Sequence, residues 1–363
     1  MHRLMPGITI LEHELSELRL LVERQTGILL DCPNSALAAH VAEHLESHEL
    51  ESPAALLDHL GASDLNPSVL PEFLDGVLNV KSGFFRHPGA MTALTRQIVP
   101  QIFARKAEEG PCTLRVWSAG CATGEEAYSI AMAVCEAMPN GNGNGCGNGN
   151  GGREKEKNGV SRPSGIADAI PASPPMLTRE WSVHIVGSDL LASAIEVAER
   201  GLYPQSALAG LPPASIRASF SRIGNAGCAQ NAASDEAQAV PANGLPRTGG
   251  ASVAPGATAN GGAYLLVKPR LRSLVTFNTM NLTKPVYIGR FDCIFCMDVL
   301  PHLSRAHRTA LIERLHLYLE PGGYLFLSQT EKLSAPNLNF RPETYDGYTF
   351  YRKPMAASAA YGR

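Results

Sequence analysis

The stretch 114–131 constrains the fold of this chain more than any other part of the sequence. It opens with an apolar run that ends at Trp117 and is typical of a buried strand. A turn containing Gly120 and Gly124 follows, and apolar residues then recur at the spacing of one helical face. This order predicts a unit that binds a nucleotide-like ligand, because glycines admit the ligand and a helix N-terminus offers free N–H groups. The spacing G-x-x-x-G differs from the G-x-G-x-x-G fingerprint of dinucleotide-binding folds.

Length and composition place the chain among globular proteins. It has 363 residues, a formal net charge of -3 and 44% hydrophobic residues, so it can bury substantial cores and is not a general nucleic-acid binder. It contains no apolar run of the roughly 18 residues that a membrane span requires, so we expect no direct membrane insertion. Eight cysteines at irregular positions favour reduced thiols and a cytoplasmic location.

Cys293 and Cys296 form a C-x-x-C pattern, which in other contexts marks a metal or redox site. Here both lie in the apolar run 291–296, which predicts a strand. Residues three apart in a strand point to opposite faces, so the two thiols are not expected to meet. Ordinary buried thiols are the favoured interpretation, and we expect no metal site.

Residues 1–78 predict an all-helical N-terminal domain. A first helix is expected to end at Gly27, Asn34 or Ser35 to cap a second, and Ser52 with Pro53 to start a third. Over residues 1–80, three basic side chains stand against thirteen acidic ones. This excess is either an ordinary solvated surface or a surface that repels acidic partners at short range.

The remainder, 79–363, predicts an α/β domain interrupted by two low-complexity segments. The segments 139–177 and 223–263 are rich in Gly, Asn, Ala and Pro, a composition that cannot bury a core. Outside them strand and helix patterns alternate, which indicates a mainly parallel sheet with helices on both faces. The last alternating run, Tyr348 to Tyr351, is interpreted as an edge strand.

Two polar positions beside these elements are candidate ligand contacts. Asp189 ends the second predicted strand, where a carboxylate is placed to bind ribose hydroxyls; the alternative is a cap for the following helix. Arg86 follows the aromatic pair Phe84 and Phe85. It either closes the seam between the two domains or binds a carboxylate through its planar fork.

A series of short motifs along the chain resembles one known family. The motifs are Phe84-Phe-Arg86, Trp117-Ser-Ala-Gly-Cys-Ala-Thr-Gly-Glu-Glu126, Gly187-Ser-Asp189, Gly201-Leu-Tyr203, Asn281-Leu282, Phe291-Asp-Cys-Ile-Phe-Cys296, Pro321-Gly-Gly-Tyr-Leu-Phe326 and Ser328-Gln-Thr-Glu331. In this order they resemble the chemotaxis-receptor methyltransferases, the CheR family, which methylate glutamate side chains with S-adenosylmethionine. The resemblance implies a class I S-adenosylmethionine-dependent methyltransferase domain of the Rossmann-like α/β class. It also implies a preceding all-α domain and an inserted small β subdomain, here at about 204–275.

The resemblance also implies a site. Carried over by position, the cofactor contacts are Ser82, Arg86, Gly120, Glu126, Asp189, Asn281, Leu282, Met297 and Asp298. In this family Arg86 lies between cofactor and substrate, where it orients the glutamate carboxylate for attack on the methyl carbon. Arg86 and His302 are the catalytic candidates. From spacing alone, Glu126 three residues after Thr123 is also compatible with a helix-capping box.

The chain departs from the family after the strand that ends at Cys296. Family members usually read Arg-Asn-Val-x-Ile-Tyr-Phe there, and this chain reads Met297-Asp-Val-Leu-Pro-His-Leu303. The Asn has become Asp298, which accepts a hydrogen bond but cannot donate one as an amide does. The family's Tyr near the cofactor has become His302, which is either a substitute polar group or a helix-start residue after Pro301.

The implied activity is methyl transfer to glutamate carboxylates of a chemoreceptor-type signalling protein, by a cytoplasmic monomer. A carboxylate is already ionised near pH 7 and needs no general base, so the reaction depends on positioning and on excluding water. Two alternatives stay open. One is a degenerate member that binds cofactor or product as a sensor or scaffold, and the other is a methyltransferase for a different substrate.

Overall fold

The computed structural model describes residues 10–62, 69–78, 82–109, 111–138, 181–222, 263–286, 288–333 and 337–355. The two predicted low-complexity segments lie outside these ranges, apart from Ala263. No helix in the described ranges is long and apolar enough to cross a membrane.

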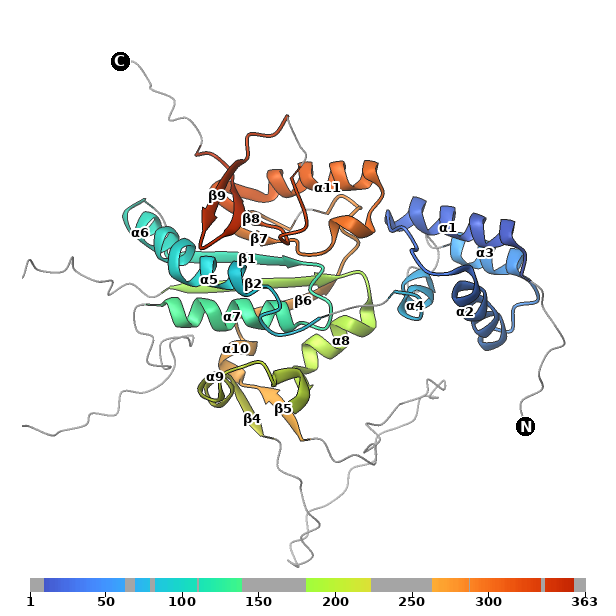
Figure 1. The fold of residues 1–363 in the computed structure, drawn as a ribbon, viewed down its shortest axis with the longest axis horizontal. Coiled ribbons are helices and arrows are strands. Elements are labelled where there is room, and N and C mark those ends of the chain that lie inside the picture. Colours follow the sequence, from blue (N-terminus) through green and yellow to red (C-terminus); the bar gives the residue numbers. More distant parts are fainter. Residues whose placement is uncertain are drawn as a thin grey trace, which may run out of the picture.

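Four helices form a compact unit at the N-terminal end, on the right of Figure 1. They are α1 (Glu12–Thr26), α2 (Asn34–Ser47), α3 (Pro53–Gly61) and α4 (Val69–Asp75). The apolar faces of these helices meet in one core that includes Leu18, Leu37, Leu60 and Phe73. We call α1–α4 the helical unit.

The ends of these helices follow the expected caps in two cases out of three. Gly27 ends α1 in the left-handed region with φ 75°, and the Ser52 hydroxyl accepts the Ala55 N–H at the start of α3. The predicted cap of α2 is wrong, because Pro33 occupies the N-cap position and no side chain caps the helix. The Asn34 side chain is engaged elsewhere, since its carbonyl accepts a hydrogen bond from Arg19 at 3.1 Å.

A seven-stranded sheet lies at the centre of the rest of the chain. Its strands are β1 (Thr113–Ala119), β2 (Ser182–Asp189), β6 (Val275–Thr279), β7 (Phe291–Phe295), β8 (Leu319–Phe326), β9 (Arg341–Tyr345) and β10 (Tyr348–Arg352). Their order is β6-β2-β1-β7-β8-β10-β9, with the first five parallel and the last two antiparallel. The strand order reverses between β1 and β7, which is the position where ligands bind in doubly wound α/β folds.

The expectation of an edge strand at Tyr348–Tyr351 is wrong. This run is β10, and it pairs with β8 on one side and with β9 on the other, so β9 is the edge. The physical reason is that Tyr348 and Phe350 are both fully buried and pack with Phe326 under the sheet. An alternating run with a large aromatic at every inward position fills a core better than it covers an edge.

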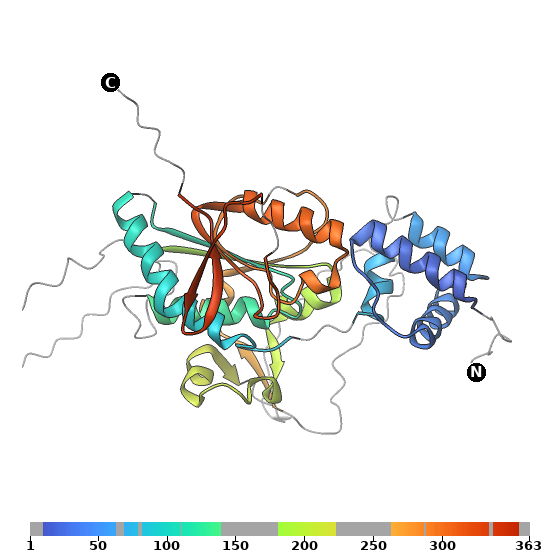
Figure 2. The ribbon, with the colours of Figure 1, turned by 45° about the horizontal axis from the view of Figure 1, so that its top comes forward.

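Helices cover both faces of the sheet (Figure 2). One core lies beneath α5 (Pro88–Ala93), the π-helix η1 (Leu94–Ile98), α6 (Val99–Glu109), α7 (Glu125–Ala137) and α8 (Ala192–Arg200). The other lies beneath α11 (Arg305–Tyr318), which follows the short 3-10 helix η3 (Leu300–His302). Cys293 belongs to the first core and Cys296 to the second, as the strand geometry predicts. Within the described residues, no cluster of three or more His, Cys, Asp or Glu side chains can hold a metal ion.

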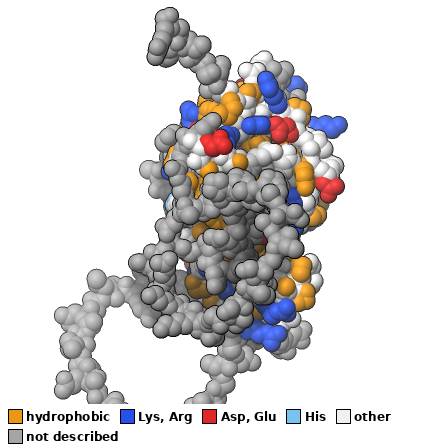
Figure 3. Space-filling model, turned by 90° about the vertical axis from the view of Figure 1, so that its left-hand side faces the viewer, with side chains coloured by type: hydrophobic (Ala, Val, Ile, Leu, Met, Phe, Trp, Pro, Cys, Tyr) orange, Lys and Arg blue, Asp and Glu red, His pale blue; other side chains and the backbone are white. Residues whose placement is uncertain are grey.

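A small antiparallel sheet lies below the main one in Figure 1. It has the order β3-β5-β4, with strands β3 (Leu202–Pro204), β4 (Phe220–Arg222) and β5 (Tyr264–Val267). The short helices η2 (Gln205–Leu208), α9 (Pro213–Ser219) and α10 (Pro269–Arg272) flank it. Basic and acidic side chains are interspersed on the upper part of the face seen in Figure 3, which looks from the side opposite the helical unit.

Candidate functional site

A cavity of about 740 Å³ lies between the helical unit and the carboxyl ends of the parallel strands. This volume is in the range of small-molecule and cofactor sites. The residues that the sequence predicted for the site all line it: Ser82, Arg86, Gly120, Glu126, Asp189, Asn281, Leu282, Met297, Asp298 and His302. The helical unit contributes Thr26, the loop 28–33, Val77 and Leu78 to the opposite wall.

The parallel register of the sheet brings these residues together. Gly120 directly follows β1, Asp189 is the last residue of β2, and Met297 comes two residues after β7. The carboxyl ends of neighbouring parallel strands meet at one edge of the sheet, so residues far apart in the chain become neighbours. Gly120 has φ 84°, and a Cβ there would approach Val299 Cγ2 to 2.5 Å, so this turn accepts only glycine without strain.

Glu126 lies in the first turn of α7 and lines the cavity. The Ser118 hydroxyl donates to its Oε1 at 2.6 Å. Burial raises the pKa of Glu126 to about 7, against the opposing effect of the Ser118 hydrogen bond, and the nearby Asp298 charge raises it further. The capping-box interpretation is wrong, because the Thr123 hydroxyl donates to Glu125 instead.

Asp189 organises the loops on both sides of the strand ends. Its Oδ2 accepts the Ala122 N–H at 2.9 Å, and its Oδ1 accepts the Leu191 N–H at 3.1 Å, at the start of α8. Burial is the main cause that raises the pKa of this carboxyl. The helix-entry role is therefore present. It leaves room for a ligand, since each carboxylate oxygen has two lone pairs and the side chain lines the cavity.

Asn281 connects the helical unit to the rest of the chain. Its side-chain amide donates to the Gln25 carbonyl at 3.0 Å, near the end of α1. Its carbonyl accepts the Thr283 N–H and hydroxyl at 2.9 and 2.8 Å. Asn281 thus borders the cavity, as does Leu282, while its own amide joins the two walls.

Arg86 is held by an anchored loop. Phe84 packs edge-on against Tyr203 and Phe220 of the small sheet, with ring centroids 4.9 and 5.3 Å apart. Phe85 has φ 52° and donates its N–H to the buried Ser129 hydroxyl at 2.9 Å. The two aromatic residues therefore act as a seam, and they fix the backbone from which Arg86 projects.

Ser82 reaches the cavity beside Glu125, a residue for which the sequence predicted no role. The hydroxyls of Ser82 and Thr123 both donate to Glu125 Oε2, at 2.7 and 2.6 Å. Glu125 is buried at the N-terminus of α7, where the helix dipole stabilises a negative charge. Through this bond Ser82 joins the Arg86 loop to α7. Apart from its place in the Glu125-Glu126 pair, no sequence signal indicates this bond.

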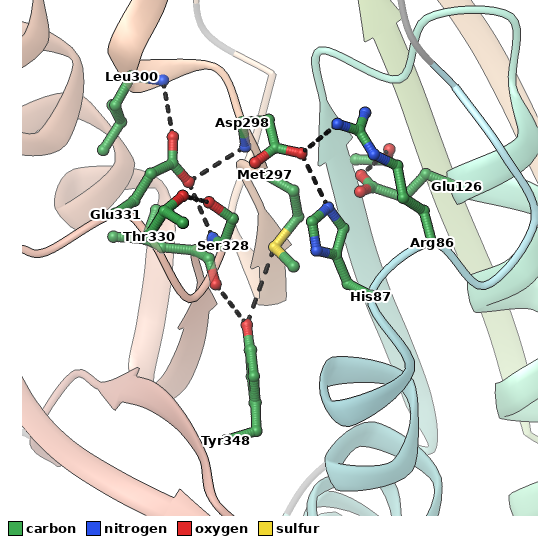
Figure 4. A network of polar contacts seen from close by, with 12 residues as sticks. Arg86, His87, Glu126, Met297, Asp298, Leu300, Ser328, Thr330, Glu331 and Tyr348 are labelled. Carbon is green, nitrogen blue, oxygen red and sulfur yellow. Dashed lines mark hydrogen bonds and ion pairs between the residues drawn. The ribbon is translucent and has the colours of Figure 1, made fainter.

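The Arg86 guanidinium binds a carboxylate, that of Asp298. Arg86 Nη2 and His87 Nε2 lie 2.9 and 3.0 Å from the same atom, Asp298 Oδ2 (Figure 4). This ion pair connects the loop before α5 with the loop after β7 across the cavity. His87 is a second residue of the site that the sequence did not predict.

Glu331 holds the loop after β7 in place. Its Oε2 accepts the N–H groups of Asp298 and Ser328 at 3.1 and 2.8 Å, and its Oε1 accepts that of Leu300 at 3.0 Å (Figure 4). Asp298 has φ 57°, a left-handed conformation that these hydrogen bonds stabilise. The position of Glu331 in the motif Ser328–Glu331, directly after a parallel strand, was the available sequence signal.

Met297 and His302 complete the same side of the cavity. Met297 is buried, and the Tyr348 hydroxyl lies 3.8 Å from its sulfur. His302 is exposed and ends the short helix η3, and its carbonyl accepts the Leu29 N–H of the helical unit at 2.8 Å. Both sequence interpretations of His302 thus find support, because it lies at a helix and also borders the cavity.

Comparison with known proteins gives a consistent assignment. The family model described as "CheR methyltransferase, SAM binding domain" matches residues 80–146 and 254–348. The "Chemotaxis protein methyltransferase" of Vibrio parahaemolyticus is 24% identical over 334 residues, 91% of this chain and 93% of that protein. "Chemotaxis protein methyltransferase 1" of Pseudomonas aeruginosa is 25% identical over 319 residues, 87% of this chain and 89% of that protein.

These matches confirm three expectations from the sequence. The α/β fold is that of class I methyltransferases, consistent with the observed seven-stranded sheet. The cofactor is S-adenosylmethionine, since the matched family model is its binding domain. The chain is therefore a member of the CheR methyltransferase family.

Proposed function

We propose that this protein transfers the methyl group of S-adenosylmethionine to glutamate carboxylates of a chemoreceptor-type signalling protein. The products are glutamate methyl esters and S-adenosylhomocysteine. The observation that carries the proposal is Arg86, which binds a carboxylate at the edge of the cofactor cavity. The names of the Vibrio and Pseudomonas relatives support a chemotaxis substrate. The proposal includes a cytoplasmic monomer, with residues 1–78 as a separate domain.

The side chains around the cavity fit the cofactor. Glu126, Asp189 and Asp298 bring three carboxyl groups to its lining, which suits a ligand with a sulfonium charge and ribose hydroxyls. S-Adenosylmethionine supplies a methyl group activated by the positive sulfur. We assign Asp189 to the ribose hydroxyls and Glu126 to the positively charged end of the cofactor. Gly120 allows the ligand to approach the backbone beside them.

The remaining contacts form the other walls of this cavity. Leu282 and Met297 contribute apolar surface, and the Ser82 hydroxyl and the Asn281 amide border it from opposite sides. Apolar walls with a few polar groups are typical of cofactor sites. We assign all four to cofactor binding.

Arg86 is assigned to the acceptor glutamate. A guanidinium binds a carboxylate by up to two parallel hydrogen bonds, which fixes the direction of the oxygen lone pairs. The acceptor is ionised near pH 7, so the protein needs to orient it and exclude water rather than remove a proton. His302, exposed at the rim of the cavity, is placed to contact the incoming chain.

The test measures methyl transfer directly. Methyl-labelled cofactor is incubated with the protein and chemoreceptor extract of the same organism, and base-labile methanol release is counted. We expect release from the wild-type protein and a loss of at least about tenfold in Arg86→Ala, with cofactor affinity measured in parallel by calorimetry. Glu196→Gln, which changes an exposed carboxylate on α8, is the matched control.

Each alternative has its own outcome in this experiment. Cofactor binding without any methanol release would favour a sensor or scaffold that does not turn over. A base-stable methylated product would favour a different acceptor. Full turnover of Arg86→Ala would remove Arg86 from the acceptor site.

A further inference from the structure

We infer that Asp298 is an internal competitor for Arg86, and that His87 makes its displacement by the acceptor carboxylate easier. The inference rests on the proposed function, in which Arg86 binds the acceptor glutamate. It gives Asp298 a second role, as the carboxylate that occupies the acceptor position before the substrate arrives.

The geometry begins with a single oxygen atom. Arg86 Nη2 and His87 Nε2 reach Asp298 Oδ2 at 2.9 and 3.0 Å, so neighbouring residues of one loop share one acceptor atom (Figure 4). The Asp298 backbone is held in the left-handed region by its hydrogen bond to Glu331. The carboxylate therefore reaches Arg86 from a backbone position that is fixed independently of this ion pair.

Asp298 competes because it is the same chemical group as the proposed acceptor. Nη2 takes part in both of the two-bond faces with which a guanidinium binds a carboxylate, so an occupied Nη2 weakens either one. The side chains of Arg86 and Asp298 are 42% and 28% exposed. Ion pairs with this exposure contribute little net free energy, so an incoming carboxylate can replace Asp298.

His87 determines what happens to Asp298 after displacement. Its side chain is 20% exposed, and its hydrogen bond to Oδ2 does not involve Arg86. When Arg86 turns to the acceptor, Asp298 keeps this donor and is not left unpaired beside Glu126, whose charge opposes it. His87 is thus a positioning residue, since it acts on the acceptor through Asp298.

The test is a double-mutant cycle on steady-state kinetics with a chemoreceptor fragment at saturating cofactor. Asp298→Asn removes the competing charge and is expected to lower the KM for the fragment about two- to fivefold, the range of an exposed ion pair. His87→Ala leaves Asp298 on Arg86 alone and is expected to raise the KM by a similar factor. In Asp298→Asn, the added His87→Ala should have no further effect on the KM. Glu196→Gln, on the surface of α8, should leave the KM unchanged.

The affinity for S-adenosylhomocysteine is measured for each variant, and it separates effects on the acceptor from effects on folding or the cofactor site. An unchanged or higher KM in Asp298→Asn, with wild-type turnover and product affinity, overturns the inference alone. An equal effect of His87→Ala in both backgrounds also overturns it. If every variant binds product and none transfers a methyl group, the proposed function fails and the inference falls with it.

Discussion

The hydroxyl of Ser118, near the end of β1, donates to Glu126 Oε1, in the first turn of α7, at 2.6 Å. The bond joins the strand and the helix on either side of the glycine turn. It also opposes the effect of burial, which raises the pKa of Glu126 to about 7. Glu126 therefore changes charge in the pH range in which the protein is expected to work, and this change affects both cofactor binding and stability.

The affinity for the cofactor should depend on the charge of Glu126. A cation beside Glu126 favours the ionised carboxylate, so the affinity for S-adenosylmethionine should rise with pH through about 7. Between pH 6 and pH 8 we expect a gain of up to about tenfold in the association constant, measured by calorimetry. S-Adenosylhomocysteine, whose sulfur is uncharged, should show a much smaller change. Glu126→Gln should bind both ligands without this pH dependence, and a flat wild-type profile for S-adenosylmethionine would contradict the assignment of Glu126.

The stability of the cofactor-free protein should depend on the same group. The folded-state pKa of Glu126 lies above its ordinary value of 4.5, so the folded protein binds more protons than the unfolded chain between these pH values. This contribution to stability is present below about pH 4.5 and is lost as the pH rises through about 7. We expect about 1–2 kcal/mol, because cavity water reduces the full effect of the shift. Urea unfolding of wild type and Glu126→Gln should differ in slope over this interval, and parallel curves would count against it.

Glu331 offers a prediction about the loop after β7. Its buried carboxylate accepts the N–H groups of Asp298, Leu300 and Ser328. Glu331→Ala leaves these donors unpaired and should lower the free energy of unfolding by about 3 kcal/mol. It should also weaken cofactor binding, since Asp298 lines the cavity. Glu331→Gln keeps one carbonyl oxygen and should lie between the two. Equal stability of Glu331→Ala and wild type in urea would show that water replaces the carboxylate.

The strand–glycine–helix unit was predictable because local rules determine it. A buried apolar run, a turn that requires positive φ and a one-sided helix each leave a direct mark on the sequence. The same holds for the ends of α1 and α3, at Gly27 and Ser52. The cap of α2 was missed because Asn34 has a tertiary partner, Arg19, that local spacing does not reveal.

The site was predictable where strand ends converge and not where loops meet across the cavity. Asp189 follows from parallel topology, and Arg86 from its motif. The contact of His87 with Asp298 joins positions 211 apart in the sequence, and no periodicity reports it. The role of Tyr348 was likewise hidden. An alternating aromatic strand has the same pattern at an edge as in the interior, and only packing on Phe326 distinguishes them.

A prediction about the glycine turn uses Gly120→Ala. The alanine must adopt φ 84° and would bring its Cβ to 2.5 Å from Val299 Cγ2, so the loop after β7 has to move. We expect a loss of about 1–3 kcal/mol in stability and weaker cofactor binding. Gly210→Ala is the control, because a Cβ there meets nothing within 4 Å. Thermal unfolding and calorimetry measure both effects, and a Gly120→Ala protein that matches Gly210→Ala in both would contradict the prediction.

Asn281 tests whether docking of the helical unit maintains the cavity. Its amide donates to the Gln25 carbonyl, and the neighbouring backbone bonds Leu29 N–H to His302 carbonyl and Ser304 N–H to Gly27 carbonyl join the same two walls. Asn281→Ala removes one bond of this set and should cost about 1 kcal/mol. Hydrogen exchange of the Leu29 and Ser304 amides should become faster, and cofactor affinity should fall, because the loop 28–33 forms one wall of the cavity.

The control for this experiment lies three residues away in the chain. Asn278 is exposed on β6, so Asn278→Ala makes the same chemical change outside the cavity lining. It should leave the exchange of both amides and the cofactor affinity as in wild type. Faster exchange in Asn281→Ala with unchanged affinity would mean that the cofactor site does not depend on the helical unit. Unchanged exchange together with unchanged affinity would instead show that the backbone bonds alone maintain the wall.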